Sequence, residues 1–473
     1  MTARDGRIVQ NYKDQQSMGY IAAGTETIYA LMDEAKHEHM KDKLYDLARK
    51  INFKSLISFG VFLSEYKNGK KKLNPDAYYK RFVEKELNYI NSKALYEKLY
   101  IDSGGFQAAN GYLSVDEIDT FHELFRKFIT NHKSEFDHTF TLDLPPYRTD
   151  MYTSENHCYD LNIKSYRNLF LNLGEEERKH IVMVKHYRTP SLQRIWTKIF
   201  SDQELMGKFN SDYWAIAGIV RSSKAEKNIP IVSIVLPMVE LLQWAIKNNK
   251  KHITIHMLAN CAPLQIFLYE AYKKMAKDLY SIKVDITYDS VGSILQIAYG
   301  RSVNYIDEYG FNKKVGFGTK DNIVEKQKYL SILNQFLEYY EIDLNFPMDY
   351  KLYNDNGSFN TGLYPITILM YIDNFRKLEK LCRDFVNEKM DLYYNNKTIE
   401  FTHALRQFIP KLNLAGDSNN ILYKIGNMQS TLDFIKYLPI NGLKGVDEYI
   451  NLYMQKDEIK YNTINEIPNY MDI

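Results

Sequence analysis

The feature that most restricts the fold is an alternation between short apolar runs and longer amphipathic stretches across residues 18–289. The short runs are partly β-branched or aromatic, and most are followed by Gly, Pro, Ser or Asn, which is typical of strands. The expected strands are Met18–Ala23, Leu56–Leu63, Leu99–Asp102, His138–Asp143, His180–His186, Tyr213–Gly218, His252–Leu258 and Lys283–Asp289.

The intervening stretches have helical periodicity. Val115–Thr130 places its apolar side chains on one helical face, and Ser114, followed by two acidic residues, suits the start of a helix. Ile234–Ile246 and Pro263–Leu279 show the same periodicity. Eight strands alternating with helices predict an α/β fold with a parallel sheet closed into a (β/α)8 barrel. An open doubly wound sheet is the alternative, because periodicity does not report closure.

The pattern changes near residue 300. Gly300–Lys320 is rich in Tyr, Asn, Gly and Lys and is expected to form a long loop. Further helices are expected at Val324–Tyr340, Pro365–Lys389, Ser430–Tyr437 and Val446–Met454. We therefore predict a barrel with an N-terminal extension over residues 1–300 and a mainly helical appended region over residues 301–473.

Composition indicates a soluble cytoplasmic protein. Hydrophobic residues make up 45% and charged residues 25%, and no apolar run approaches the roughly 20 residues needed to cross a bilayer. The N-terminus lacks the apolar run of a secretory signal. Three scattered cysteines fit a reducing compartment, which would be the host cytoplasm for a phage-encoded protein. A net charge of +2 leaves nucleic-acid binding to local patches.

The segment Tyr100–Gln107, with the sequence YIDSGGFQ, is the most informative for chemistry. Asp102 at a strand end would stand at the C-terminal mouth of a barrel, where barrel active sites lie. The two glycines allow a tight turn close to a flat ligand, on which Phe106 would stack and to which Gln107 would hydrogen-bond. A plain strand-to-helix turn with Asp102 as a cap is the alternative.

Residues 102–107, DSGGFQ, resemble the signature of the tRNA-guanine transglycosylase superfamily, which includes enzymes that place 7-deazaguanines in DNA. Phe140–Pro146 is similar to the family's second aspartate motif, and Ala215–Ile219 to the strand that ends in a glycine pair. Val284–Val291 is similar to the strand that carries the nucleophile, and His256–Pro263 to the segment before it. The resemblance covers roughly residues 18–300.

The resemblance implies a role for each matched residue. Asp289 would attack the sugar C1′ and form a covalent intermediate, while Asp102 would act as the general acid and base. Asp143 would read the edge of a guanine-like base, and the backbone near Gly218 would contact the base carbonyl. The remaining substrate contacts would come from Ser103, Gly105, Phe106 and Gln107.

Asp285 is an alternative nucleophile, because it has the same strand parity as Asp289 and would face the same way. Asp289 is preferred because it is nearer the end of the strand.

The chain departs from the family in two places. The family has a zinc site of three cysteines and one histidine after the nucleophile strand, whereas only Cys382 and His403 follow here, so no zinc or other cofactor is expected. Residues 301–473 would replace that zinc subdomain. Lys185 and His186 stand where the tRNA enzymes have a base-reading glutamine, so both become candidate substrate contacts.

These observations predict a pentosyltransferase that replaces guanine in DNA with a 7-deazaguanine derivative through an aspartyl–sugar intermediate. DNA is preferred to tRNA because both departures lead away from the tRNA enzymes. A divergent tRNA-guanine transglycosylase and a catalytically silent nucleic-acid-binding barrel are the alternatives. Lysines and arginines after residue 300, such as Lys377, Lys380 and Arg406, are candidates for phosphate contacts.

Overall fold

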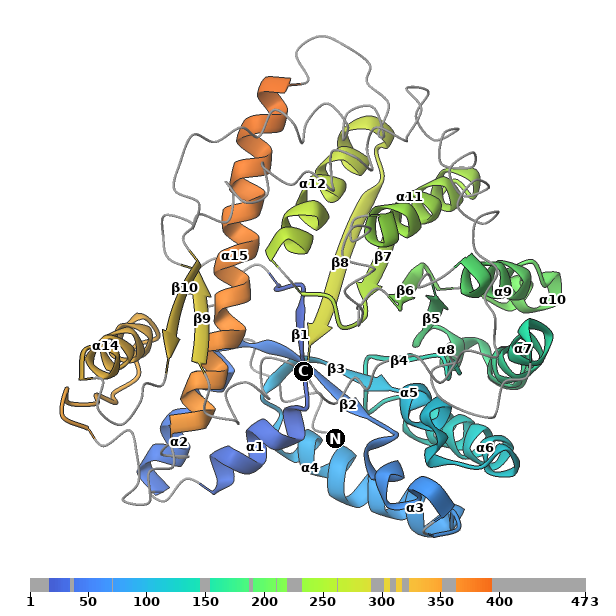
Figure 1. The fold of residues 1–473 in the computed structure, drawn as a ribbon, viewed down its shortest axis with the longest axis horizontal. Helices are drawn as coiled ribbons and strands as arrows, with labels where there is room; N and C mark the ends of the chain where they lie inside the picture. The colour runs from blue at the N-terminus through green and yellow to red at the C-terminus, as the bar shows by residue number, and fades with distance from the viewer. Residues whose placement is uncertain are drawn as a thin grey trace.

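The computed structural model describes residues 17–34, 38–69, 71–144, 154–186, 190–209, 211–218, 232–261, 263–290, 302–306, 312–316, 323–350 and 363–393. Eight parallel strands pair in chain order and close into a barrel, with helices on the outside (Figure 1). Closure is made by β1, which pairs with β2 on one side and with β8 on the other. The predicted (β/α)8 barrel is therefore confirmed, and the open sheet is excluded.

The barrel strands are close to those expected from the sequence. They are β1 Tyr20–Ala23, β2 Phe53–Ser58, β3 Tyr96–Asp102, β4 His138–Phe140, β5 Ile181–His186, β6 Tyr213–Ala217, β7 His252–Met257 and β8 Lys283–Ser290. The largest difference is at β2, which begins earlier than expected because Lys54 and Ser55 are buried within it. Lys54 Nζ donates to the carbonyl of Met18, which satisfies a charge that the sequence pattern would place outside.

The helices of the barrel half follow the expected order. They are α1 Thr25–Asp33, α2 Glu38–Ile51, α3 Pro75–Phe82, α4 Asn88–Lys93, α5 Gly105–Gln107, α6 Val115–His132, α7 Glu155–Asn172, α8 Glu175–Arg178, α9 Pro190–Phe200, α10 Gln203–Lys208, α11 Val232–Lys247 and α12 Pro263–Tyr280. Short 3₁₀ turns occupy Val61–Glu65 and Lys67–Gly69, and π turns occupy Val83–Leu87 and Ala108–Tyr112. At the start of α6, Ser114 and Glu117 form the reciprocal hydrogen bonds of a capping box.

Strand alternation separates two cores. Side chains that point into the barrel form a compact cluster of Ile21, Leu56, Tyr100, Phe140, Val182, Val184, Tyr213 and Ala215. Their neighbours along each strand point outward and join the larger core between the sheet and the helices. The barrel interior is therefore filled, which leaves its C-terminal mouth as the place for chemistry.

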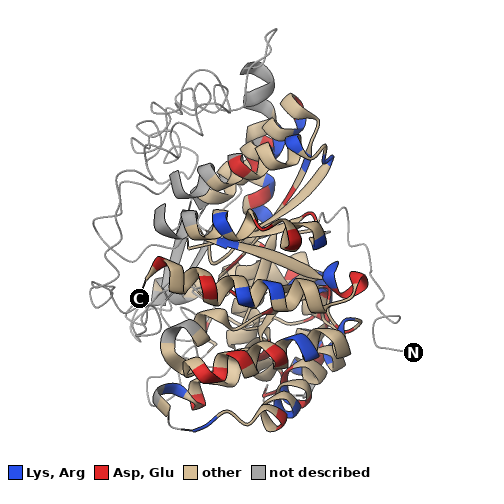
Figure 2. Ribbon diagram, turned by 90° about the vertical axis from the view of Figure 1, so that its right-hand side faces the viewer, with Lys and Arg blue, Asp and Glu red and all other residues tan. Residues whose placement is uncertain are grey.

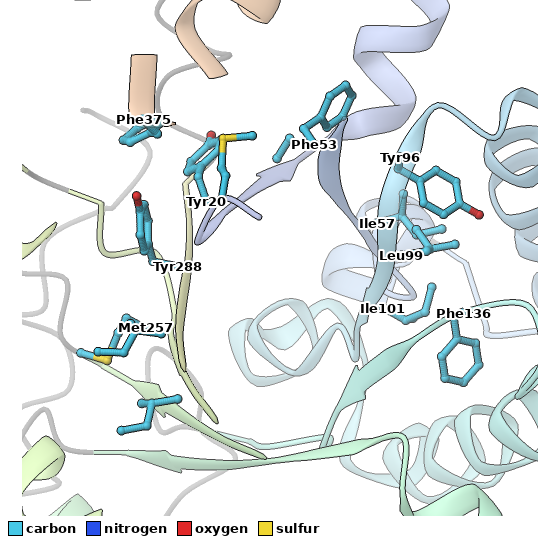
Figure 3. Packing of buried hydrophobic residues seen from close by; sticks show 14 of the residues in the cluster. Tyr20, Phe53, Ile57, Tyr96, Leu99, Ile101, Phe136, Met257, Tyr288 and Phe375 are labelled. Atoms are coloured by element: carbon cyan, nitrogen blue, oxygen red, sulfur yellow. The ribbon is translucent and has the colours of Figure 1, made fainter. Parts of the chain in front are cut away.

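The long helix α15, Tyr364–Tyr393, completes the ring of helices. It packs against α12 on one side and against α1 and α2 on the other, which is the position of the helix that follows β8 (Figure 1). Phe375 of this helix stacks on Tyr20 of β1 with ring centroids 4.1 Å apart and also contacts Tyr288 of β8 (Figure 3). A segment from beyond residue 300 thus covers the seam where the barrel closes.

A buried carboxyl group reinforces that seam. Glu379 of α15 accepts hydrogen bonds from the backbone N–H of Gly19 and from the hydroxyl of Tyr288. Burial raises the pKa of Glu379 above its usual range. The same carboxyl therefore joins α15 to both strands of the closure.

The region between β8 and α15 also contains strands. Residues 302–306 and 312–316 form an antiparallel hairpin, β9 Ser302–Ile306 and β10 Asn312–Gly316, inside the stretch that was expected to be a loop. The expected helix at Val324–Tyr340 is present as α14, Ile323–Tyr339. The helices expected at Ser430–Tyr437 and Val446–Met454 lie outside the described residues. Among the helices that the structure describes, none is long and apolar enough to span a membrane.

Candidate active site

Asp102 is the last residue of β3 and shares the inward parity of Tyr100. Its Oδ2 accepts a hydrogen bond from the hydroxyl of Ser58, at 2.6 Å, and another from the backbone N–H of Gly104, at 3.2 Å. Ser58 ends the neighbouring strand β2 and pairs directly with Asp102 in the sheet register. Two strand ends therefore fix this carboxyl at the mouth of the barrel.

The glycines of the DSGGFQ segment are required by close backbone contacts. Gly104 has φ +82°, and a Cβ there would stand 2.5 Å from the Cα of Gly60. A Cβ on Gly105 would stand 2.0 Å from the backbone oxygen of Asp143. The segment from β3 therefore packs tightly on the ends of β2 and β4, and this packing brings Asp102 and Asp143 into one site.

Asp102 has the electrostatic character of a general acid. Burial, together with the charges of Asp143 and Asp289, raises the pKa of this carboxyl from its ordinary value of 3.8 to about 6. The hydrogen bonds from Ser58 and Gly104 oppose the rise. A carboxyl group that holds its proton near pH 6 can deliver it to a departing base and recover it afterwards.

Asp143 follows β4 and is held by a histidine. Oδ2 of Asp143 accepts a hydrogen bond from Nε2 of His186, the last residue of β5. The His186 side chain is 2% exposed, and its ring packs on that of Trp196, with centroids 4.5 Å apart. Nδ1 of His186 is buried without a hydrogen-bond partner among the described residues. His186 thus lies beside Asp143, and its contact with substrate stays a prediction.

Asp289 is on β8, at the same end of the barrel. Its Oδ1 accepts a hydrogen bond from the backbone N–H of Ala259, at 2.7 Å, and lies 3.1 Å from Nε2 of His256. Oδ2 has no hydrogen-bond partner among the described residues. Ala259 has φ +55°, a strained conformation for a residue with a side chain, and this conformation presents its N–H to the carboxylate. One oxygen is thus fixed, and no described residue is hydrogen-bonded to the other.

Asp285 lies at the opposite end of the barrel. Its Oδ2 is 2.8 Å from Nε2 of His252, the first residue of β7, and 3.0 Å from Nζ of Lys283. The four residues from Asp285 to Asp289 span about 13 Å of strand. Strand parity alone left the two aspartates equivalent, but their positions separate them: Asp289 is with Asp102 and Asp143, and Asp285 is not.

The other residues that were predicted to contact substrate differ in where they lie: some are at the mouth of the barrel, and one is on its outer surface. Phe106 is 48% exposed in the turn after Asp102, whereas Ser103 is buried and accepts a hydrogen bond from the N–H of Gly105. Gln107 Oε1 is buried without a partner among the described residues, and Gly218 adopts φ +76° after β6.

Lys185 does not join the aspartates. It points outward from β5, and its Nζ pairs with Glu240 of α11 at 2.9 Å. The ion pair accounts for its burial, so the structure gives this lysine no place among the substrate contacts.

The sequence reasoning did not single out His256, which contacts Asp289. It is fully buried on β7, and its Nδ1 lies 2.9 Å from the hydroxyl of Thr287. Thr287 Oγ1 is in turn 2.7 Å from the hydroxyl of Tyr213, which lies 3.4 Å from that of Tyr100. Strand parity could have indicated this residue. His256 and Leu258 are two residues apart in an expected strand, so both side chains face into the barrel.

The described residues do not fit the zinc site of the resembled family. Among them, no group of three or more His, Cys, Asp or Glu side chains is arranged to hold a metal ion. Cys382 is buried in α15, and burial raises the pKa of its thiol well above the usual range. His403 lies outside the described residues, so the absence of zinc stays a prediction.

The mouth of the barrel thus brings together three carboxyl groups with different surroundings: one protonatable near neutral pH, one paired with a histidine, and one with a single oxygen fixed by two N–H groups.

Comparison with known proteins adds no family assignment, because no protein-family model and no curated protein matches the chain.

Proposed function

We propose that the protein is a base-exchange transglycosylase that replaces guanine in DNA with a 7-deazaguanine derivative. The observation that carries the proposal is the contrast between Asp102 and Asp289 at one barrel mouth. Asp102 has a pKa raised to about 6, and Asp289 has one oxygen held by N–H groups and the other open. Base exchange at C1′ by double displacement uses this combination of a proton donor and a carboxylate nucleophile.

The chemical steps follow those of a retaining glycosidase. Oδ2 of Asp289 forms a bond to C1′ while the bond from C1′ to the base nitrogen breaks, and the departing base takes a proton from Asp102. The incoming base then bonds to C1′ through its nitrogen and gives its proton to the Asp102 carboxylate. The bond between C1′ and Oδ2 breaks in this step, and its electron pair returns to Asp289.

Base recognition in this proposal comes from Asp143. A carboxylate accepts the two N–H donors on the amino-pyrimidinone edge that guanine shares with 7-deazaguanines. The hydrogen bond from His186 occupies one oxygen of Asp143 and orients the group. Phe106, exposed in the same turn as Asp102, supplies an aromatic face for stacking.

Binding of DNA would depend on basic side chains that contact its phosphates. Figure 2 shows Lys and Arg interspersed with Asp and Glu along the helices that face the viewer. Two lysines of α15 that were candidates for phosphate contacts are near acidic partners, Lys377 at 3.7 Å from Asp373 and Lys380 at 2.6 Å from Asp384. Arg406 lies outside the described residues.

The experiment that tests the function measures transfer of labelled guanine. Wild-type protein is incubated with duplex DNA or with tRNA, and label in each polymer is counted at several salt concentrations. We expect label in DNA, decreasing steeply as salt increases, because phosphate contacts release counterions. Duplex DNA must also release a paired base into the site, which makes partly unpaired duplexes faster substrates.

Label that enters tRNA and never DNA would identify the polymer as tRNA and leave the aspartate chemistry in place. If neither polymer takes up label and no covalent adduct forms with either, base exchange is not the function of this protein.

A further inference from the structure

Asp289 belongs to a chain of buried polar groups that continues into the barrel, away from the mouth. The chain runs from the Asp289 carboxylate through His256 and Thr287 to Tyr213, with successive contacts of 3.1, 2.9 and 2.7 Å. Of these residues, His256 is fully buried, Thr287 is 5% exposed and Tyr213 is 6% exposed. Polar groups placed this deeply are costly unless each is satisfied, so their arrangement indicates a specific requirement.

The chemistry of the contacts determines which nitrogen of His256 carries hydrogen. A carboxylate oxygen only accepts, so Nε2 of His256 must be the donor toward Asp289 Oδ1. In a neutral ring Nδ1 is then an acceptor, and the Thr287 hydroxyl donates to it. The Tyr213 hydroxyl lies 2.7 Å from Thr287 Oγ1 and continues the chain. The Asp289 carboxylate thus selects the tautomer, and Thr287 holds the plane of the ring.

Both donors to Asp289 converge on the same atom. Oδ1 accepts from Ala259 N–H and from His256 Nε2, and Oδ2 accepts from no described residue. The two carboxylate oxygens, which are equivalent in a free aspartate, are therefore distinct in this protein.

We propose that His256 is a positioning residue, which together with the Ala259 N–H holds Oδ1 of Asp289 and makes Oδ2 the attacking atom. This inference rests on the proposed function. In the covalent intermediate Oδ1 becomes the carbonyl oxygen of the aspartyl ester. When the ester breaks, negative charge returns to the carboxylate, and the same two N–H groups stabilise it there. His256 exchanges no proton with substrate.

The first test substitutes His256 and Thr287 and measures adduct formation in a single turnover, together with DNA affinity. His256→Leu should slow adduct formation by about a hundredfold, because a carboxylate that is no longer held at Oδ1 does not keep Oδ2 aligned with C1′, with little change in affinity. His256→Gln should recover the rate to within about tenfold of wild type, because its amide supplies a donor of similar reach. Thr287→Val, which keeps the side-chain shape, should slow it by about tenfold.

The matched control is His252→Leu, which removes the same residue type from the same strand at the other end of the barrel. It should leave adduct formation unchanged. A wild-type rate in His256→Leu, or a loss in His256→Gln as large as in His256→Leu, would overturn the positioning role.

The second test does not depend on activity. Nitrogen NMR of histidine-labelled protein reports which ring nitrogens are protonated, and the His256 signals are those lost in His256→Gln. We expect Nε2 of His256 to carry hydrogen, and its signals to move in Thr287→Val and in Asp289→Asn. A ring protonated on Nδ1 alone would contradict the hydrogen-bond scheme.

The two proposals fail in different ways. A wild-type protein that exchanges no base and forms no adduct defeats the proposed function, and the positioning role of His256 with it. A wild-type protein that exchanges bases while His256→Leu forms the adduct at the same rate defeats only the present inference.

Discussion

Two histidine–aspartate pairs join β7 to β8 at opposite ends of the barrel. His256 pairs with Asp289 at the C-terminal mouth, and His252 pairs with Asp285 at the N-terminal end, with the same four-residue spacing on each strand. The His252 and Asp285 side chains are 47% and 45% exposed, whereas those of His256 and Asp289 are 0% and 9% exposed. The same residue types therefore experience water at one end and the protein interior at the other.

This contrast shows why residue type and parity do not define an active site. At the exposed end Asp285 is hydrogen-bonded by both Lys283 and His252, and these bonds lower the pKa of Asp285 although its partial burial opposes them. At the mouth, burial raises the pKa of Asp102. Surface ion pairs contribute little to stability, and groups in a dry cleft have perturbed chemistry.

The largest expected difference between the two ends is in catalysis. Asp289→Asn should bind DNA but lose base exchange and the covalent adduct by about a thousandfold or more, because the amide is a poor nucleophile. Asp285→Asn, the matched control, should retain exchange within about twofold. The measurement is guanine transfer together with detection of the adduct on a denaturing gel. An adduct that persists in Asp289→Asn and disappears in Asp285→Asn would transfer the nucleophile role to Asp285.

The second difference concerns stability. His256→Leu removes one of the two donors to a buried carboxylate and should lower the free energy of unfolding by about 3 kcal/mol at neutral pH. His252→Leu breaks an exposed pair and should cost less than about 1 kcal/mol. Urea denaturation of both variants gives the comparison. Equal decreases in the free energy of unfolding would show that burial does not distinguish the His256–Asp289 pair from the His252–Asp285 pair.

The third difference is in the direction in which each aspartate changes the stability of the protein as pH rises. The folded pKa of Asp102 is raised to about 6, so its ionisation costs stability progressively as pH rises from about 4 to 6. Asp102→Asn removes that cost and should stabilise the protein by on the order of 2 kcal/mol above pH 6, with no gain below pH 4. Exchange should be lost at every pH.

Asp285 should behave in the opposite way. Its pKa is lowered in the folded state, so the ionised group contributes stability that is lost as pH falls through the folded pKa. Asp285→Asn should therefore destabilise the protein slightly at neutral pH and not in strong acid. Denaturation curves between pH 3 and 8 measure how the stability change of each variant depends on pH. If the stability changes of Asp102→Asn and Asp285→Asn vary with pH in the same direction, the two aspartates do not differ as predicted.

The smallest expected effect is that of metal removal. With no Cys/His quartet after β8 in the sequence, prolonged treatment with a chelator should change neither base exchange nor the unfolding midpoint. Elemental analysis of the purified protein should find no stoichiometric zinc. One tightly bound zinc per chain would show that the C-terminal half supplies ligands that the sequence pattern does not indicate.

Much of the barrel could be predicted from sequence because parallel strands buried on both faces leave short, continuous apolar runs. The limits of that pattern appear at Lys54, whose buried amine is satisfied by a carbonyl far away in the chain. The helix α15 could be expected from the sequence, but its docking against β1 and β8 depends on tertiary contacts such as those of Phe375. Periodicity carries no information about such partners.

The positions of several residues in the candidate site could also be predicted from the sequence. The strand end and the glycines that follow it predicted the place of Asp102, and the family resemblance added Asp143 and Asp289, whose charges reach Asp102 in the structure. Lys185 has the same strand parity as Met183, which faces the outer core, so parity indicated that Lys185 points outward. Lys185 was nevertheless grouped with the substrate contacts because it is adjacent to His186 in the sequence. His256 was hidden for a different reason, because a histidine in a strand gives no indication of the hydrogen bonds it makes.

The position of α15 has a consequence for synthesis of the chain. The last barrel strand ends at Ser290, and the helix that covers the closing seam ends at Tyr393, about a hundred residues later. At roughly 5–20 residues per second, a ribosome needs about 5–20 s to make that interval. During this time Tyr20 and Tyr288 lack the aromatic cover that Phe375 provides. The nascent barrel should therefore be most prone to aggregation and to chaperone capture within this interval, and a ribosome stalled just before residue 364 should hold it there.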